Sequence, residues 1–171
     1  HKAKIASLLS DTDRLRAQLD VSERTSLTNQ AAIEGLRAAI EQRFRSFRYW
    51  YTDPLEEGVV DDKWFWSENH RLIVHTLEYL SGRSQPEAVF DVTGETGAVH
   101  AARGRDRIEA WLDEKARFGF SEWHSDVYYA KDIEPLLLLT EFAAPDLAAR
   151  AAAMLDLFLY DIATHQLQGN M

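Results

Sequence analysis

The chain has 171 residues, of which 46% are hydrophobic and 27% are charged, and this is enough apolar sequence for one sizeable core. Its formal net charge of −9 argues against general nucleic-acid binding, which needs a basic surface. The same charge also argues against an anionic substrate, unless a local patch of arginines reverses its sign. Cysteine is absent, so the composition excludes disulfides and thiolate metal sites.

No secretory signal is visible, and the leucine run at residues 136–139 is far too short to cross a membrane. The sequence begins with His1 and ends at Met171 without an evident stop signal. We therefore expect the chain to be a segment of a longer protein.

Two helices are predicted at the start of the chain. Residues 3–20 and 29–48 each carry apolar side chains near a 3.6-residue period, whereas residues 22–30 are polar and predict a break. We interpret residues 1–48 as an N-terminal helical pair. This pair is a candidate docking arm for a protein partner or for self-association.

Residues 49–171 are predicted to form one helical-hairpin domain. Loops containing proline or glycine separate its apolar-periodic segments. The predicted helices cover residues 63–80, 98–118 and 132–142, and a last one opens at Pro145. No segment of useful length alternates with the period of two that strands require. The sequence therefore predicts an all-α fold of consecutive antiparallel helical hairpins.

Two clusters of aromatic and polar residues stand at helix starts. Residues 64–70 read WFWSENH, and residues 120–129 read FSEWHSDVYY. In a chain of antiparallel hairpins, alternate helices start at the same end of the domain, so both clusters should lie on one rim. Binding and catalytic residues concentrate in loops at one face of a rigid scaffold. We therefore expect a functional site at this rim.

The candidate residues of this site fall into two groups. The candidate catalytic residues are Asn69, His70, Tyr128 and Tyr129, and the candidate substrate-binding residues are Trp66, Glu68, Glu122, Trp123 and His124. A structural role stays open for each: the histidine and the aromatics as packing residues, and Glu122 with Asp126 as helix caps. No HExxH or other metal-ligand spacing and no phosphate-binding loop occurs, so neither a metal nor a cofactor is expected.

At these clusters the sequence resembles the α/α-toroid polysaccharide lyases, the alginate-lyase and heparinase-like group. Members of this group carry an Asn-His pair at the start of an inner helix and, later, a Tyr before an apolar helix that ends in Phe-Ala. The matching residues here are Asn69-His70, Tyr128 or Tyr129, and Phe142-Ala143, within roughly residues 60–165. Glu68 stands where the family usually has Asn. The two blocks also resemble parts of uncharacterised bacterial proteins.

The resemblance implies part of an α/α toroid that acts on a polysaccharide or oligosaccharide by β-elimination at a uronic acid. Asn69 and His70 would neutralise the sugar carboxylate, and Tyr129, or else Tyr128, would remove the C5 proton. Trp66 and Trp123 would stack on sugar faces.

Two other functions remain open. A glycoside hydrolase of the same architecture needs two carboxylates, and Glu68 with Glu122 or Asp126 is a candidate pair. A non-enzymatic interaction or scaffold domain would instead use the aromatic loops as an interface, because tryptophan and tyrosine are enriched in binding hot spots.

Overall fold

The computed structural model describes the backbone of residues 2–125 and 127–165, and the side chains from residue 14 onward within those ranges. The chain divides into two compact units, His1–Arg43 and Phe44–Met171. All regular structure in the described ranges is helical, and the one strand-like pairing there is an isolated bridge between Val89 and Thr96. The all-α prediction is confirmed.

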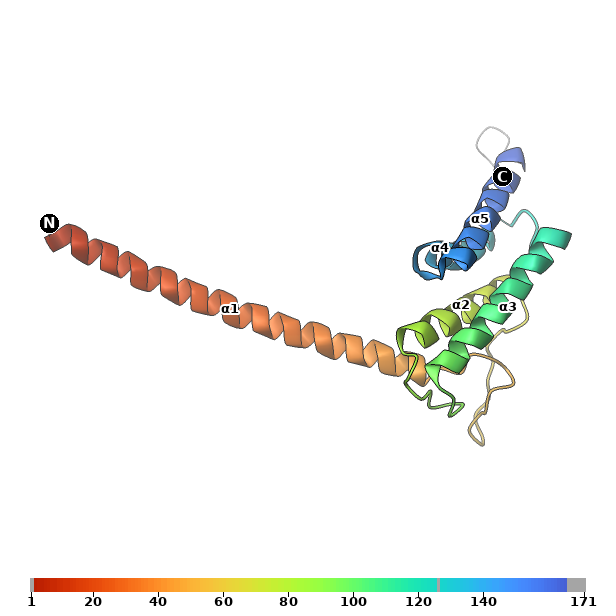
Figure 1. The fold of residues 1–171 in the computed structure, drawn as a ribbon, viewed down its shortest axis with the longest axis horizontal. Helices are drawn as coiled ribbons and strands as arrows, with labels where there is room; N and C mark the ends of the chain where they lie inside the picture. Colours follow the sequence, from red (N-terminus) through yellow and green to blue (C-terminus); the bar gives the residue numbers. More distant parts are fainter. Residues whose placement is uncertain (1, 126, 166–171) are drawn as a thin grey trace. The chain divides into compact units, whose positions relative to one another are not determined.

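One long helix, α1 (Lys2–Arg45), replaces the predicted helical pair, and Figure 1 shows it as uninterrupted. The predicted break at residues 22–30 is wrong. That segment contains neither glycine nor proline, and two of its hydroxyl groups bond to their own helix. The Thr25 hydroxyl donates to the Val21 carbonyl at 2.9 Å, and the Thr28 hydroxyl donates to the Arg24 carbonyl at 2.9 Å. Polar residues alone therefore do not end this helix.

The second unit holds four further helices. They are α2 (Glu68–Ser84), α3 (Gly97–Phe118), α4 (Tyr129–Phe142) and α5 (Pro145–His165). Two helices begin three or more residues away from the predicted position. α2 begins five residues later than predicted because the Ser67 hydroxyl caps it by accepting the His70 amide. α4 begins three residues earlier than predicted, so Pro135 lies inside the helix and not in its first turn.

The core of this unit forms where α2 packs on α3 and α4 packs on α5. Its largest fully buried side chains include Trp111, Phe158 and Tyr129. The α2–α3 contact is unusually close, since a Cβ on Gly104 would lie 2.7 Å from the Tyr79 amide nitrogen. Only glycine permits this approach. Within the described residues, no helix combines the length and the apolar character that crossing a bilayer requires.

Candidate functional site

The aromatic residues before α2 divide into one buried and two exposed side chains. Phe65 is buried and meets the Trp50 ring edge-on at 5.7 Å between centroids. Trp64 and Trp66 are exposed and lie against each other at 5.0 Å. This alternation is typical of an extended segment, in which successive side chains point to opposite sides. The segment thus anchors itself through Phe65 and presents two indole rings to solvent.

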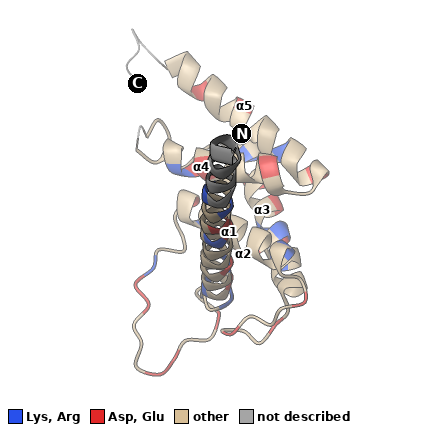
Figure 2. Ribbon diagram, turned by 90° about the vertical axis from the view of Figure 1, so that its left-hand side faces the viewer, with Lys and Arg blue, Asp and Glu red and all other residues tan. Residues whose placement is uncertain are grey.

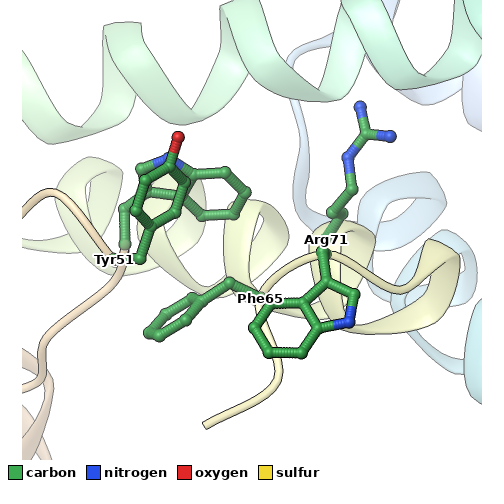
Figure 3. Close-up of a pocket in the computed structure, with 5 residues that line it drawn as sticks. Tyr51, Phe65 and Arg71 are labelled. Carbon is green, nitrogen blue, oxygen red and sulfur yellow. The ribbon is translucent and has the colours of Figure 1, made fainter. Parts of the chain in front are cut away.

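An open cleft of about 570 Å³ lies beside this segment. Its lining residues are Trp50, Tyr51, Phe65, Trp66 and Arg71 (Figure 3). The side chains of Trp66 and Tyr51 are 68% and 60% exposed, so their ring faces remain open to a ligand. The Arg71 guanidinium is only partly engaged, by Glu114 at 3.2 Å on the surface. The cleft therefore combines several aromatic rings with one cation.

Three arginines of α3 are paired with carboxylates, and one of them comes close to the cleft. Basic segments of α3 are drawn in blue in Figure 2. Arg103 and Arg107 bond to the buried Glu78, whereas Arg105 pairs with Glu109. The guanidinium carbon of Arg107 lies 4.9 Å from the centroid of the Trp50 ring, which lines the cleft. The charges of these arginines are therefore balanced within the fold, and Arg71 is the cation that lines the cleft.

The two predicted site loops meet, as expected from their common rim. Asn69 is buried and its side-chain amide donates to Glu122 at 2.6 Å. The amide and hydroxyl of Ser121 donate to Glu68 at 2.6 and 2.7 Å. His70 is exposed, and its Nδ1 lies 2.6 Å from the Ser67 hydroxyl. Of the matched Asn-His pair, only the histidine therefore faces solvent.

The two candidate tyrosines differ in environment. Tyr128 is exposed, whereas Tyr129 is buried and donates its hydroxyl proton to Asp161 at 2.7 Å. Burial raises the pKa of Tyr129 to about 12, and the hydrogen bond to Asp161 and the charge of Asp161 act in the same direction. The hydrogen bond from the His124 amide opposes this shift. A phenol with a raised pKa is a poor general base near neutral pH. This environment counts against a base role for Tyr129.

Trp123 and His124 lie apart from the aromatic cleft as a stacked pair with ring centroids 4.0 Å apart. Trp123 is exposed, and His124 belongs to a cluster with Asp161 and His165 in which one ligand atom from each residue lies within 4.8 Å of the others. Imidazole and carboxylate groups in this arrangement are typical of transition-metal ligands. Asp126, part of one candidate hydrolase pair, lies outside the described residues.

A second, largely buried cluster involves residues of α2, α3, α4 and the loop before α4. Glu68 accepts a bond from Lys115 at 2.5 Å, and both side chains are almost completely buried. One carboxylate oxygen from each of Glu68, Glu122 and Asp132 lies within 4.8 Å of the others. Burial, followed by the charges of Glu68 and Glu122, raises the pKa of Asp132 to about 8, whereas Lys115 opposes the shift.

Several residues of these sites were not predicted from the sequence. Lys115 carried a usable signal, because it shares the apolar stripe of α3 with Trp111 and Leu112, and a lysine on such a stripe needs a buried acid. Asp132 resembled an ordinary helix-start residue, and Arg71 an ordinary surface residue. Local pattern does not distinguish these roles.

A scan against protein-family models finds no match to this chain, and searches of curated proteins and of solved structures find none either.

Proposed function

We propose that the protein binds an acidic carbohydrate in the cleft formed by Trp50, Tyr51, Phe65, Trp66 and Arg71. The observation that carries this proposal is the combination of exposed ring faces with a partly engaged guanidinium in one cleft. Aromatic rings offer flat apolar surfaces on which the C–H faces of sugars stack. A guanidinium pairs with a carboxylate through two parallel hydrogen bonds. A uronic-acid unit satisfies both features.

The proposed reaction, if the bound sugar is cleaved, is β-elimination. His70 is exposed and can approach a ligand, whereas Asn69 and Tyr129 are buried and bonded to acidic side chains. Hydrolysis by Glu68 with Glu122 is less well supported, because Glu68 is only 4% exposed and presents no face to a sugar. In either case we propose that the two helical pairs α2–α3 and α4–α5 belong to a larger α/α toroid.

Replacing Trp66 with alanine should weaken the binding of a uronate oligosaccharide about tenfold, or ~1.4 kcal/mol, because one stacking face is lost. Arg71→Gln should weaken uronate binding by a similar factor and leave binding of the matching neutral oligosaccharide unchanged. Titration calorimetry of the full chain measures both effects.

Tyr160→Ala is the matched control, since Tyr160 is 68% exposed on α5 and does not line the cleft. Equal losses in the Tyr160 and Trp66 variants, or no uronate binding by the unaltered protein, would reject the proposal. Ultraviolet absorbance of the same mixtures reports unsaturated product. Product that persists in His70→Ala would reject the proposed role of His70.

The long helix supports a second candidate function, which is self-association. Residues 5–40 fit a heptad repeat in which the a and d positions form a single seam. The described apolar residues of this seam are each more than half exposed: Leu15, Leu19, Ile33, Leu36 and Ile40. Exposed leucines and isoleucines in one stripe mark an interaction surface.

We propose that a second copy of the chain covers this seam as a parallel coiled coil. When two parallel chains are aligned in register, each apolar seam residue faces the same residue of the other chain. The polar seam residues Ser22, Ser26 and Asn29 also face their equivalents. An antiparallel pair in which Ser26 opposes Asn29 would set Arg16 beside Arg37 of the other copy, and like charges there repel. The charge pattern therefore favours the parallel arrangement.

Leu36→Asp should weaken the dimer at least tenfold, because a carboxylate would enter the seam. Leu27→Asp is the matched control: Leu27 is 71% exposed on the same helix but lies at a b position outside the seam. Sedimentation equilibrium measures the dimer dissociation constant of each variant. A monomeric unaltered protein, or equal effects of the two substitutions, would reject the coiled coil.

A further inference from the structure

Asp132 is a buried carboxyl group whose surroundings do not satisfy it. Its exposed fraction is 0%, and neither of its carboxylate oxygens has a hydrogen-bond partner among the described residues. An unpaired buried carboxylate is costly, since the lost hydration is not replaced. Yet the structure places this group within 4.8 Å of carboxylate oxygens of Glu68 and Glu122. The cluster thus gathers three acids around one point and leaves one of them without a partner.

The partners of the other two acids leave oxygen atoms available. Glu68 Oε2 accepts bonds from Lys115 and from both polar groups of Ser121, whereas Oε1 has one long contact, 3.5 Å from the Glu122 amide. Glu122 Oε2 accepts the Asn69 amide. Within the described residues, the second oxygen of Glu122 and both oxygens of Asp132 accept no bond. Three different carboxylates can therefore contribute a ligand atom.

We propose that Glu68, Glu122 and Asp132 bind one divalent cation that prefers oxygen ligands, such as Mn²⁺ or Mg²⁺. Carboxylate oxygens are the ligands that these cations select. Three ionised carboxylates facing the Lys115 ammonium leave two negative charges, which a divalent cation neutralises. The three ligands come from the start of α2, the loop before α4 and the first turn of α4, so the cation would join these elements.

The cation differs from the carbohydrate in size and in access. Asp132 and Glu68 are 0% and 4% exposed, so a sugar ring has no access to their carboxylates. A proton held by Asp132 is the competing explanation of the unpaired carboxyl group. It predicts no cation binding, so the two explanations are separable by experiment.

The test uses the full chain after treatment with EDTA, titrated with Mn²⁺ alone. We expect one Mn²⁺ per chain by titration calorimetry, an electron paramagnetic resonance spectrum of bound Mn²⁺, and a rise in Tm on binding. Asp132→Asn should weaken binding at least tenfold. This variant should fold, because it replaces an unpaired buried acid by a neutral group of the same size. Glu122→Gln should also weaken binding at least tenfold.

The controls separate this site from other acidic groups. Asp156 is exposed on α5, outside the cluster, and Asp156→Asn should leave Mn²⁺ binding unchanged. His165→Ala should also leave it unchanged, because His165 belongs to the other cluster. No Mn²⁺ binding by the unaltered chain, unchanged binding in Asp132→Asn, or a loss confined to His165→Ala would each overturn the proposal.

Discussion

Replacing Glu78 with alanine should lower the free energy of unfolding of the second unit by about 3–5 kcal/mol. Glu78 is completely buried in α2 and bonds to two arginines of α3: Arg103 Nε donates to Oε1 at 2.8 Å, and Arg107 donates to Oε2 at 2.9 Å. His100 also contacts Oε1, at 3.0 Å. Removing the carboxylate leaves partly buried guanidinium groups without their partner, and this penalty exceeds the lost attraction.

The pKa of Glu78 is consistent with a strongly held carboxylate. Burial alone would raise the pKa, but the bonds from His100 and Arg103 and the charges of Arg103 and Arg107 outweigh it and lower the pKa. The carboxylate is therefore ionised in the folded protein. Its contribution to stability is present above the pKa of an unfolded glutamate and is lost as the pH falls through the lowered folded value.

Urea unfolding of Glu78→Ala and Glu109→Ala provides the comparison. Glu109 pairs with Arg105 at 2.8 Å across one turn of α3, but both side chains are about a third exposed. Such surface pairs contribute roughly 0.2–1 kcal/mol, so Glu109→Ala should have a small effect. Similar losses in both variants would show that the Glu78 network does not hold α2 to α3.

The helices were predictable to the extent that local signals specify them. Gly119, with a positive φ of 74°, ends α3 where the sequence predicts, and Pro145 opens α5. The break in α1 was wrong because the segment around Thr25 and Thr28 is polar but lacks any residue that opposes helical geometry. Polarity reports solvent exposure, and an exposed helix is polar as readily as a loop is.

The site was less predictable because its central contacts join residues far apart in the chain. The spacing of WFWSENH suggested which residues stand near each other, but not that Phe65 turns inward and its two tryptophan neighbours outward. Glu68 was expected to face a substrate, and it is buried because Lys115 of α3 lies opposite it. Nothing within a few residues of Glu68 signals this lysine, so the depth of the carboxylate depends on how α2 packs on α3.

His75 should make the second unit sensitive to acid. This side chain is 3% exposed, its Nδ1 has no hydrogen-bond partner among the described residues, and its ring lies 4.7 Å from that of Trp50. Burial, followed by the charge of Arg107, lowers the pKa of His75 from 6.5 to about 3, against the opposing charge of Glu78. Protonation of this imidazole in the folded protein is therefore strongly disfavoured.

The sign of the pH dependence follows from proton binding. Between the two pKa values, 6.5 unfolded and about 3 folded, the unfolded chain binds a proton at His75 that the folded chain does not. The free energy of unfolding should therefore be highest above pH 6.5 and fall by about 1.4 kcal/mol per pH unit as the pH drops through this window, on the order of 5 kcal/mol in all. His75→Leu should remove this part of the acid dependence, since leucine carries no proton-binding group.

Urea unfolding of the unaltered protein and of His75→Leu at several pH values between 7.5 and 4 measures the difference. The free energies of unfolding of the two proteins should diverge as the pH falls. Measured from its own value at neutral pH, that of His75→Leu should fall less than that of the unaltered protein. His165→Leu removes a histidine that is much more exposed, at the end of α5, and should leave the acid dependence in place. Parallel curves for the unaltered protein and His75→Leu would show that the buried imidazole is not the group that couples folding to pH. Acid unfolding would then be due to carboxylates whose pKa values are lowered in the folded protein, such as Glu78.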